Sequence, residues 1–181
     1  MKKQTLSLAA FLLVLLGFVL VDCNKAKAAD NGFWWHNLLT QQGRNAAIVN
    51  AALSYPDGYK FTGDGECKGW VKTVVLAASG NVVSIPPNAN DSTWQASPNV
   101  GQDYPAFPAS GEIIQMHWNT TLHTMIVLSS GPAGMNVIDC NWYKVDPRNP
   151  QKSAVNCVFR HSITWTEFRA KATAYSVYYI K

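Results

Sequence analysis

Cys67 is the residue in this chain best suited to nucleophilic chemistry. It follows the glycine-rich, acidic stretch Gly63–Glu66 and directly precedes an apolar helical pattern that begins at Val71. A cysteine in the first turn of a helix faces unpaired backbone N–H groups and the positive end of the helix dipole. Both favour the thiolate, which is the nucleophilic form. The stretch therefore predicts a reactive thiol at Cys67.

A thiolate nucleophile needs a base, usually histidine, and the base needs an orienting group on its other ring nitrogen. His123 opens the apolar strand pattern Thr124–Leu128, so its ring can lie at the rim of a core sheet. Asp139 lies on the next predicted strand and can accept a hydrogen bond from one nitrogen of His123 while the other faces Cys67. The spacing thus predicts a Cys67–His123–Asp139 site.

The cysteine count bears on which thiol stays free. Cys23 lies in the apolar N-terminal segment, and its removal leaves Cys67, Cys140 and Cys157, an odd number for an oxidising compartment. Cys140 and Cys157 are predicted cross-strand partners across the turn at 146–150. Such a disulfide would add about 2–4 kcal/mol of stability. It would leave Cys67 as the free thiol.

A zinc site is an alternative use of the histidines. His117, His123 and His161 are suitable ligands by residue type. They lack a helical histidine spacing, however, and a zinc site would leave Cys67 without a role. His117 and His161 are therefore interpreted as structural, and His161 is expected to point away from the site, on the same strand face as Cys157. We expect no metal and no cofactor.

The elements around Cys67 predict an α+β fold, because helices come first and an antiparallel sheet follows. A first helix is predicted over Asn37–Ser54, and the helix that starts at Cys67 ends at Ser79–Asn81. The segment Val82–Ser110 is predicted to be a long loop, of a kind that is usually functional or disordered. The strands are predicted at Glu112–Trp118, His123–Ser130, Asn136–Val145, Val155–Ile163 and Ala174–Ile180, with a short helical turn at Trp165–Arg169.

Two tryptophans are predicted to lie near a substrate groove. Trp94 is placed there because it lies in the long loop, and Trp142 because it neighbours Asn141. The remaining tryptophans are interpreted as core or loop anchors.

Several of these motifs, in their order along the chain, resemble the papain-like CHAP and NlpC-type cysteine peptidases and amidases of bacterial cell walls. The resemblance covers nearly the whole chain after residue 28. Two motifs resemble those of CHAP enzymes: Gly65-Glu66-Cys67 is similar to Gly-Gln-Cys, and Asp139-x-Asn141-Trp142 is similar to Glu-x-Asn-Trp. Cys67-x-Gly69-Trp70-Val71 is similar to the Cys-Ser-Gly-apolar-Val of NlpC-type enzymes. Gly111-Glu112-Ile113-Ile114 is similar to the Gly-Asp-Ile/Val element that opens the sheet in both.

The resemblance implies a papain-like fold with N-terminal helices packed on a C-terminal antiparallel sheet. It implies Cys67 as nucleophile, His123 as base, Asp139 as orienting residue and Asn141 as an auxiliary polar group. Glu66 stands where CHAP enzymes have a glutamine that would help to cradle the oxyanion or the substrate. Its charge departs from that pattern, because a nearby anion disfavours a thiolate. Leu122 replaces the glycine that often precedes the histidine.

The N-terminus predicts a secretory signal peptide over residues 1–28, followed by one hydrolase domain over 29–181. Lys2 and Lys3 precede an apolar run over 6–21, and Ala26-Lys27-Ala28 offers the small residues of a cleavage site. An uncleaved N-terminal anchor is an alternative, since the run approaches a spanning length. A lipoprotein signal at Cys23 fits poorly because Asp22 precedes it.

The charge of the chain belongs mostly to this N-terminal segment. The chain has 15 basic and 11 acidic residues, and residues 1–28 carry four of the basic and one of the acidic ones, which leaves 11 and 10. The remaining net charge of +1 offers no basic footprint for nucleic acid. The expected localisation is the cell envelope or the exterior, with the chain acting as a monomer.

The sequence therefore predicts a secreted cysteine hydrolase that cleaves amide bonds in peptidoglycan, at a stem peptide or a cross-bridge. It does not distinguish an amidase from an endopeptidase. Two alternatives stay open: a catalytically silent wall-binding or interaction module on the same fold, and a thiol-dependent acyltransferase acting on lipid or protein.

Overall fold

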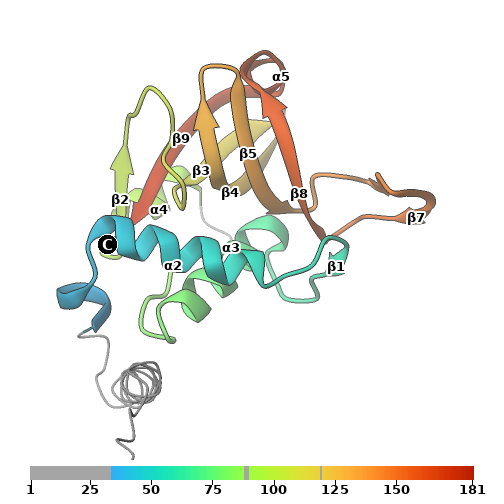
Figure 1. The fold of residues 1–181 in the computed structure, drawn as a ribbon. Coiled ribbons are helices and arrows are strands. Elements are labelled where there is room, and N and C mark those ends of the chain that lie inside the picture. Colours follow the sequence, from blue (N-terminus) through green and yellow to red (C-terminus); the bar gives the residue numbers. More distant parts are fainter. Residues whose placement is uncertain (1–33, 88–89, 119) are drawn as a thin grey trace, which may run out of the picture.

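A computed structural model describes residues 34–87, 90–118 and 120–181 of the chain (Figure 1). The predicted signal peptide over 1–28 lies outside the described residues. Within them, no helix has both the length and the apolarity needed to cross a membrane.

Two helices of similar length precede every strand of the main sheet except the short β1 (Tyr59–Lys60). A short π-helical turn, η1 (Trp34–Leu38), leads into α2 (Gln41–Leu53), whose first turn is capped by the Thr40 side chain accepting from the Gly43 N–H. The second helix, α3 (Glu66–Ala78), carries Cys67 in its first turn. Both helices agree with the sequence-based prediction to within a few residues.

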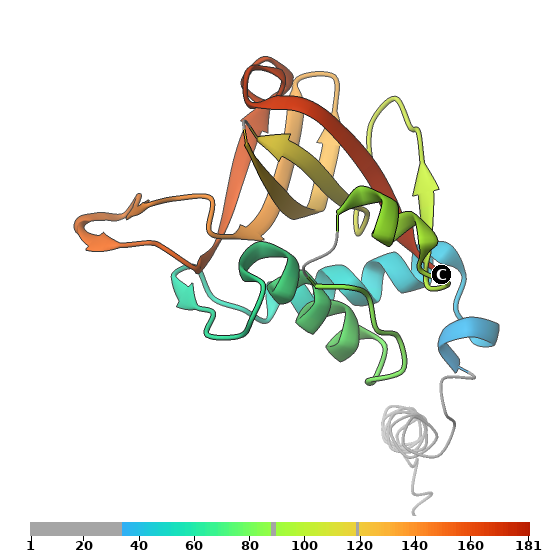
Figure 2. The same cartoon turned by 180° about the vertical axis from the view of Figure 1, so that it is seen from behind.

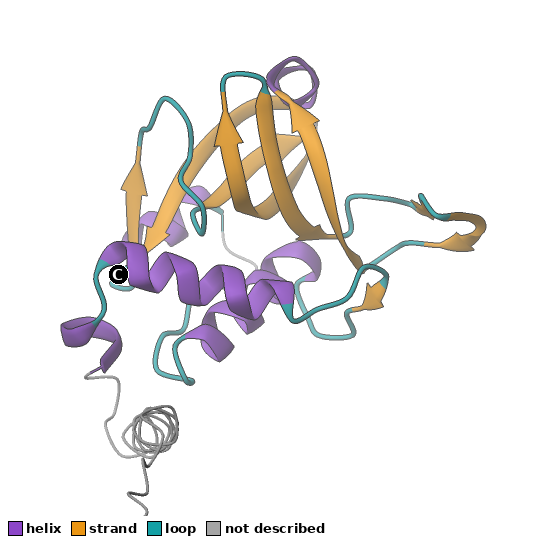
Figure 3. Cartoon of the chain, viewed as in Figure 1, coloured by secondary structure: helices purple, strands orange, loops and turns teal. Residues whose placement is uncertain are grey.

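A seven-stranded antiparallel sheet forms the rest of the main body (Figure 3). The strand order is β1-β8-β5-β4-β3-β9-β2. Consecutive strands β3, β4 and β5 are neighbours, and β8 lies on the far side of β5. The strands are β1 (Tyr59–Lys60), β2 (Val100–Asp103), β3 (Ile113–Trp118), β4 (Thr121–Gly131), β5 (Gly134–Cys140), β8 (Cys157–Thr164) and β9 (Ala172–Ile180). The predicted α+β class is confirmed.

The sheet separates two apolar clusters. On one face, Ile126 and Ile138 join a large core with α2 and α3, in which Trp70 and Val74 are fully buried. On the other face, a smaller cluster contains Met125, Val127, Val137 and Phe168. Phe168 belongs to α5 (Trp165–Lys171), which connects β8 to β9 at the end of the sheet away from α2 and α3 (Figure 1). Because successive side chains of a strand point to opposite faces, alternation decides which of them pack on α2 and α3 and which join the cluster of Phe168.

The segment predicted as a long loop, Val82–Ser110, contains two regular elements. Helix α4 (Asp91–Ala96) begins with the Asn90 side chain accepting from the Thr93 N–H, and β2 adds to the edge of the sheet beside β9 (Figure 2). Trp94 of α4 is fully buried in the large core and packs on Tyr178, with ring centroids 5.5 Å apart. Its predicted place beside a substrate groove is therefore wrong.

The predicted strand Asn136–Val145 ends early, at Cys140. Asn141 then takes a left-handed backbone conformation, with φ of 72°, which ends the ladder. The chain continues into a separate hairpin of β6 (Val145–Asp146) and β7 (Asn149–Ser153), which projects from the body (Figure 1).

The predicted Cys140–Cys157 disulfide is wrong. Val158, not Cys157, pairs with Cys140, and Phe159 pairs with Asp139. Directly paired residues point to the same face, so Cys157 lies on the face of Asp139 and Cys140 on the opposite one. Cys140 belongs to the large core and Cys157 to a small cluster with Ala154 and Phe159, and both are free thiols.

Candidate active site

The loop before α3 presents Cys67 at the start of the helix. Gly65 and Glu66 both adopt left-handed backbone conformations, with φ of 87° and 47°. This conformation is costly for Glu66, because it has a Cβ atom. The loop then packs directly on the helix at Gly69, where a Cβ atom would lie 1.7 Å from the Asp64 carbonyl oxygen. Cys67 is thus held at the helix start by a tight, glycine-dependent turn.

His123 and Asp139 form a buried hydrogen-bonded pair on neighbouring strands. Nε2 of His123 lies 3.1 Å from Oδ2 of Asp139. Asp139 is fully buried, and His123 nearly so. The other ring nitrogen of His123 is left for the thiol of Cys67, whose Sγ lies 4.0 Å from the carbonyl oxygen of the adjacent Leu122. The three residues of the predicted site are therefore brought together.

This geometry favours an ionised thiol and a charged imidazole. Burial alone would lower the pKa of His123, but the Asp139 carboxylate and its hydrogen bond outweigh burial and raise the pKa to about 10. Burial alone would likewise raise the pKa of the Cys67 thiol. The hydrogen bond and positive charge of His123, helped by the Thr124 backbone, bring the pKa below its ordinary value. Both shifts favour a thiolate–imidazolium pair over two neutral groups.

The carboxylate of Asp139 has a second partner that the sequence interpretation missed. Nε2 of His161, on β8, lies 3.0 Å from the same oxygen, Oδ2. His161 was expected to point away from the site. It does share a face with Cys157, as expected, but β8 pairs with β5 so that this face is also that of Asp139. Burial raises the pKa of Asp139, but the positive charge and hydrogen bond of His123, together with the hydrogen bond from His161, bring it below its ordinary value.

Asn141 and Glu66 contact each other at the edge of the site. The Asn141 Nδ2 donates to Glu66 Oε2 at 2.9 Å, and its Oδ1 accepts from the backbone N–H of Asn156 at 2.9 Å. Asn141 makes no hydrogen bond to His123. The structure therefore places Asn141 as a link between the loop of Glu66 and the start of β8.

Aromatic rings surround the two histidines. The Trp142 ring stacks on His161, with centroids 4.8 Å apart and planes at 28°, and meets His123 edge-on at 5.3 Å. Trp118 lies beside Trp142 at 4.8 Å, and the Lys171 ammonium lies over both indole rings. An ion pair is stronger in a buried setting than in water, and Cys67 and His123 are both buried.

A cavity of about 390 Å³ opens over these groups. It contains Cys67 and His123 in its wall, so a substrate bound in it would meet the thiol. Trp142 and Glu66, both predicted to contact substrate, also line this cavity. The lining residues are Glu66, Cys67, Trp118, Thr120, Thr121, Leu122, His123, Asn141, Trp142 and Lys144.

The histidines considered for zinc are not gathered in one place. Nε2 of His117 lies 2.8 Å from Oδ2 of Asp91, whereas His123 and His161 share Asp139. In the described part of the chain, no three histidine, cysteine, aspartate or glutamate side chains are arranged to hold a metal ion.

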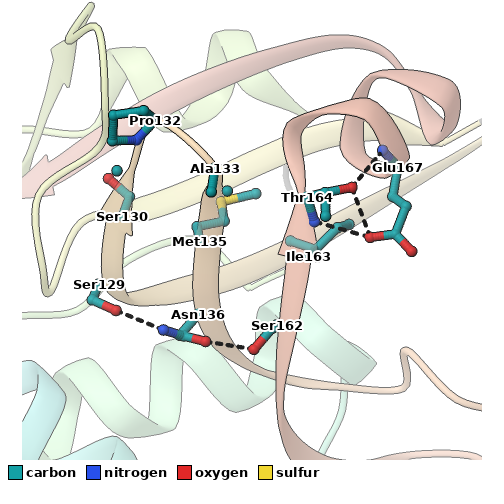
Figure 4. Close-up of a pocket in the computed structure, with 12 residues that line it drawn as sticks. Ser129, Ser130, Pro132, Ala133, Met135, Asn136, Ser162, Ile163, Thr164 and Glu167 are labelled. Carbon is teal, nitrogen blue, oxygen red and sulfur yellow. Dashed lines mark hydrogen bonds between the residues drawn. The ribbon is translucent and has the colours of Figure 1, made fainter.

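A second cavity, of about 490 Å³, lies at the tip of the β4–β5 hairpin, beside the start of α5 (Figure 4). Its polar side chains are largely paired with one another. Asn136 donates to Ser129 at 2.9 Å and accepts from Ser162 at 2.6 Å, and Thr164 is bonded to Glu167 (Figure 4). This cavity contains none of the residues predicted for the site.

Comparisons with known proteins give weak similarities. No protein-family model and no curated protein matches the chain. The crystal structure of Ly7917 with the hydrolyzing product of MDP aligns with 74% of this chain and 62% of its own, at 15% identity and a TM-score of 0.48. Another crystal structure of Ly7917 aligns with 74% and 61%, at 16% identity and a TM-score of 0.45. The chain thus spans less than two thirds of either structure.

Proposed function

We propose that this chain is a cysteine hydrolase that cleaves amide bonds in peptidoglycan, with Cys67 as the nucleophile. The observation that carries the proposal is that Cys67 and His123 lie together in the wall of a cavity, with His123 hydrogen-bonded to the fully buried Asp139 behind it. An activated thiol, a base and an orienting acid are the three parts that nucleophilic acyl transfer requires.

Each group has a defined part in the reaction. The Cys67 thiolate attacks the carbonyl carbon, and a C–S bond forms as the carbonyl oxygen becomes an oxyanion. The His123 imidazolium gives its proton to the amide nitrogen, the C–N bond breaks and the amine leaves. Water then attacks the thioester while His123 takes its proton, and the carboxylic acid is released with the thiolate restored.

The N-terminal turn of α3 can support the oxyanion. Its first N–H groups have no acceptor within their own helix, and they lie at the positive end of the helix dipole. Asp139 holds the ring of His123 in place and favours its charged form. Glu66 would contact substrate at the edge of the cavity, together with Trp142.

The substrate class and the fold family rest on the sequence. The motifs at Gly65–Cys67 and Asp139–Trp142 resemble those of the CHAP and NlpC-type enzymes, which act on amide bonds of bacterial cell walls. Residues 1–28 resemble a secretory signal peptide, which would bring the enzyme to the wall. The cleaved bond would be the sugar–peptide bond of an amidase or a peptide bond of an endopeptidase.

The test is digestion of purified cell wall followed by mass spectrometry of the released muropeptides. Wild-type enzyme should release fragments, and Cys67→Ala should release none. Cys157→Ala is the matched control, since Cys157 is a buried free thiol outside the cavity, and it should retain activity. Lysis by a folded Cys67→Ala variant would overturn the proposal. Sedimentation with the wall without any released fragment would identify a binding module instead.

A further inference from the structure

We propose that His161 is a positioning residue of the active site, which acts on Cys67 through Asp139 and His123. It donates a second hydrogen bond to the carboxylate oxygen that holds His123. The inference rests on the proposed role of Cys67 as nucleophile and adds a fourth residue to the site.

The geometry around Asp139 supports this role. Its Oδ2 accepts from His123 at 3.1 Å and from His161 at 3.0 Å, while its Oδ1 is buried without a hydrogen-bond partner among the described residues. The carboxylate is fully buried, and the two hydrogen bonds it accepts from described residues both come from histidines. Without His161, a single imidazole would have to hold a buried carboxylate in place, and a poorly satisfied buried charge is costly.

A neutral imidazole is sufficient for this task. The His161 side chain is only 6% exposed, and its Nδ1 makes no hydrogen bond within the described residues. A neutral ring protonated at Nε2 donates to Asp139 and leaves the negative charge of the carboxylate for His123. His161 therefore helps to keep the carboxylate ionised and fixed in position for His123.

His161 also supports one wall of the cavity. Trp142 stacks on its ring and meets His123 edge-on, and Trp142 lines the cavity. A variant must therefore separate hydrogen bonding from stacking. His161→Gln retains a neutral N–H donor and loses the aromatic ring, whereas His161→Phe retains the ring and loses the donor.

The readout is the rate at which iodoacetamide alkylates Cys67 in the full chain between pH 4 and 9. Mass spectrometry of the peptide that contains Cys67 measures this alkylation. This rate reports the thiolate and needs no substrate. On the acid limb of this pH profile, the alkylation rate falls as the Cys67 thiolate is protonated. In His161→Phe this limb should move to higher pH, and a move of one pH unit would make alkylation about tenfold slower at a given acid pH. In His161→Gln the alkylation rates on the acid limb should lie within about twofold of those of the wild type.

The matched control is His117→Gln, which removes another imidazole hydrogen-bonded to a carboxylate, Asp91, outside the site. Its profile should equal that of the wild type. An unchanged acid limb in folded His161→Phe, or an equal shift in His161→Gln, would overturn the proposal. If the wild-type chain releases nothing from cell wall yet shows the His161-dependent limb, the substrate is wrong and the positioning role stands.

A second measurement needs no variant. In chain labelled with ¹⁵N-histidine, the long-range ¹H–¹⁵N spectrum distinguishes the two neutral tautomers. His161 should be protonated at Nε2 at the pH where Cys67 is a thiolate. A tautomer protonated only at Nδ1 could not donate to Asp139 and would refute the proposal even if the variants fail to fold.

Discussion

Nε2 of His123 lies 3.1 Å from Oδ2 of Asp139, and the two residues come from the adjacent antiparallel strands β4 and β5. In that register Asp139 lies opposite Met125, the second residue after His123, so all three side chains share a face. The base and its acid are thus positioned by one hairpin, and the following predictions concern what this pair does for Cys67.

The first prediction concerns pH. Because the pKa of Cys67 is lowered, hydrolysis should already proceed below pH 9, and it should fall at acid pH as the thiolate is protonated. Because the pKa of His123 is raised to about 10, activity should fall again as the pH rises through that value and the imidazolium loses its proton. A profile of kcat/KM against pH checks both limbs.

Asp139→Asn should change this profile, since it keeps an acceptor for His123 but removes the charge. The pKa of His123 should fall, the acid limb for Cys67 should move to higher pH, and kcat should drop by about 10² or more. An unchanged alkaline limb in this variant would show that Asp139 does not set the charge of His123.

The second prediction concerns Gly69. Gly69→Ala would place a Cβ atom 1.7 Å from the carbonyl oxygen of Asp64, so the loop that presents Cys67 must move. Overpacking of this kind costs about 1–3 kcal/mol, and urea unfolding should show it. Gly131→Ala is the control, because no atom lies within 4 Å of its added Cβ, and its stability should be nearly unchanged.

The third prediction contrasts two tryptophans. Trp94→Ala should lower the free energy of unfolding by about 3–5 kcal/mol, because Trp94 is fully buried in the large core. Trp142→Ala should cost less stability, because Trp142 is only partly buried, and should reduce kcat/KM for wall because it lines the cavity. Urea unfolding and the digestion assay separate the two effects, and a stability loss in Trp142→Ala equal to that in Trp94→Ala would count against this assignment.

The fourth prediction concerns Glu66. Glu66→Gln keeps an acceptor for Asn141 but removes a negative charge one residue from the thiolate. The anion disfavours the thiolate, so its removal should speed alkylation of Cys67 on the acid limb, by about two- to threefold for an exposed charge. Asp64→Asn, in the same loop but outside the cavity lining, should have a smaller effect. Slower alkylation in Glu66→Gln would contradict the prediction.

The parts of the site that were predictable depend on local patterns. Cys67 at a helix start follows from the glycine-rich turn and the apolar period after it. His123 and Asp139 lie on consecutive strands joined by a short hairpin, and such strands usually pair. The alternation along β5 also separated Asp139 from Cys140 correctly.

The parts of the site that were not predictable depend on the long connection between β5 and β8. Residues 141–156 form their own hairpin between β5 and β8, so nothing local sets the register of β8. A shift of one residue exchanges the two faces of a strand. Two predictions failed because this register was unknown: the pairing of Cys157 with Cys140, and the orientation of His161 away from Asp139. Trp94 was misplaced for a similar reason, because the short helix α4 buries a residue that composition alone assigns to a loop.

The order of the strands has a consequence for the chain before it folds. His123, Asp139 and His161 lie on three neighbouring strands, and Cys67 lies on a helix far earlier in the sequence. A chain that is still extended would have only ordinary thiols and ordinary imidazoles. The reactivity of Cys67 would therefore appear only once these three strands have paired and α3 has packed on the sheet.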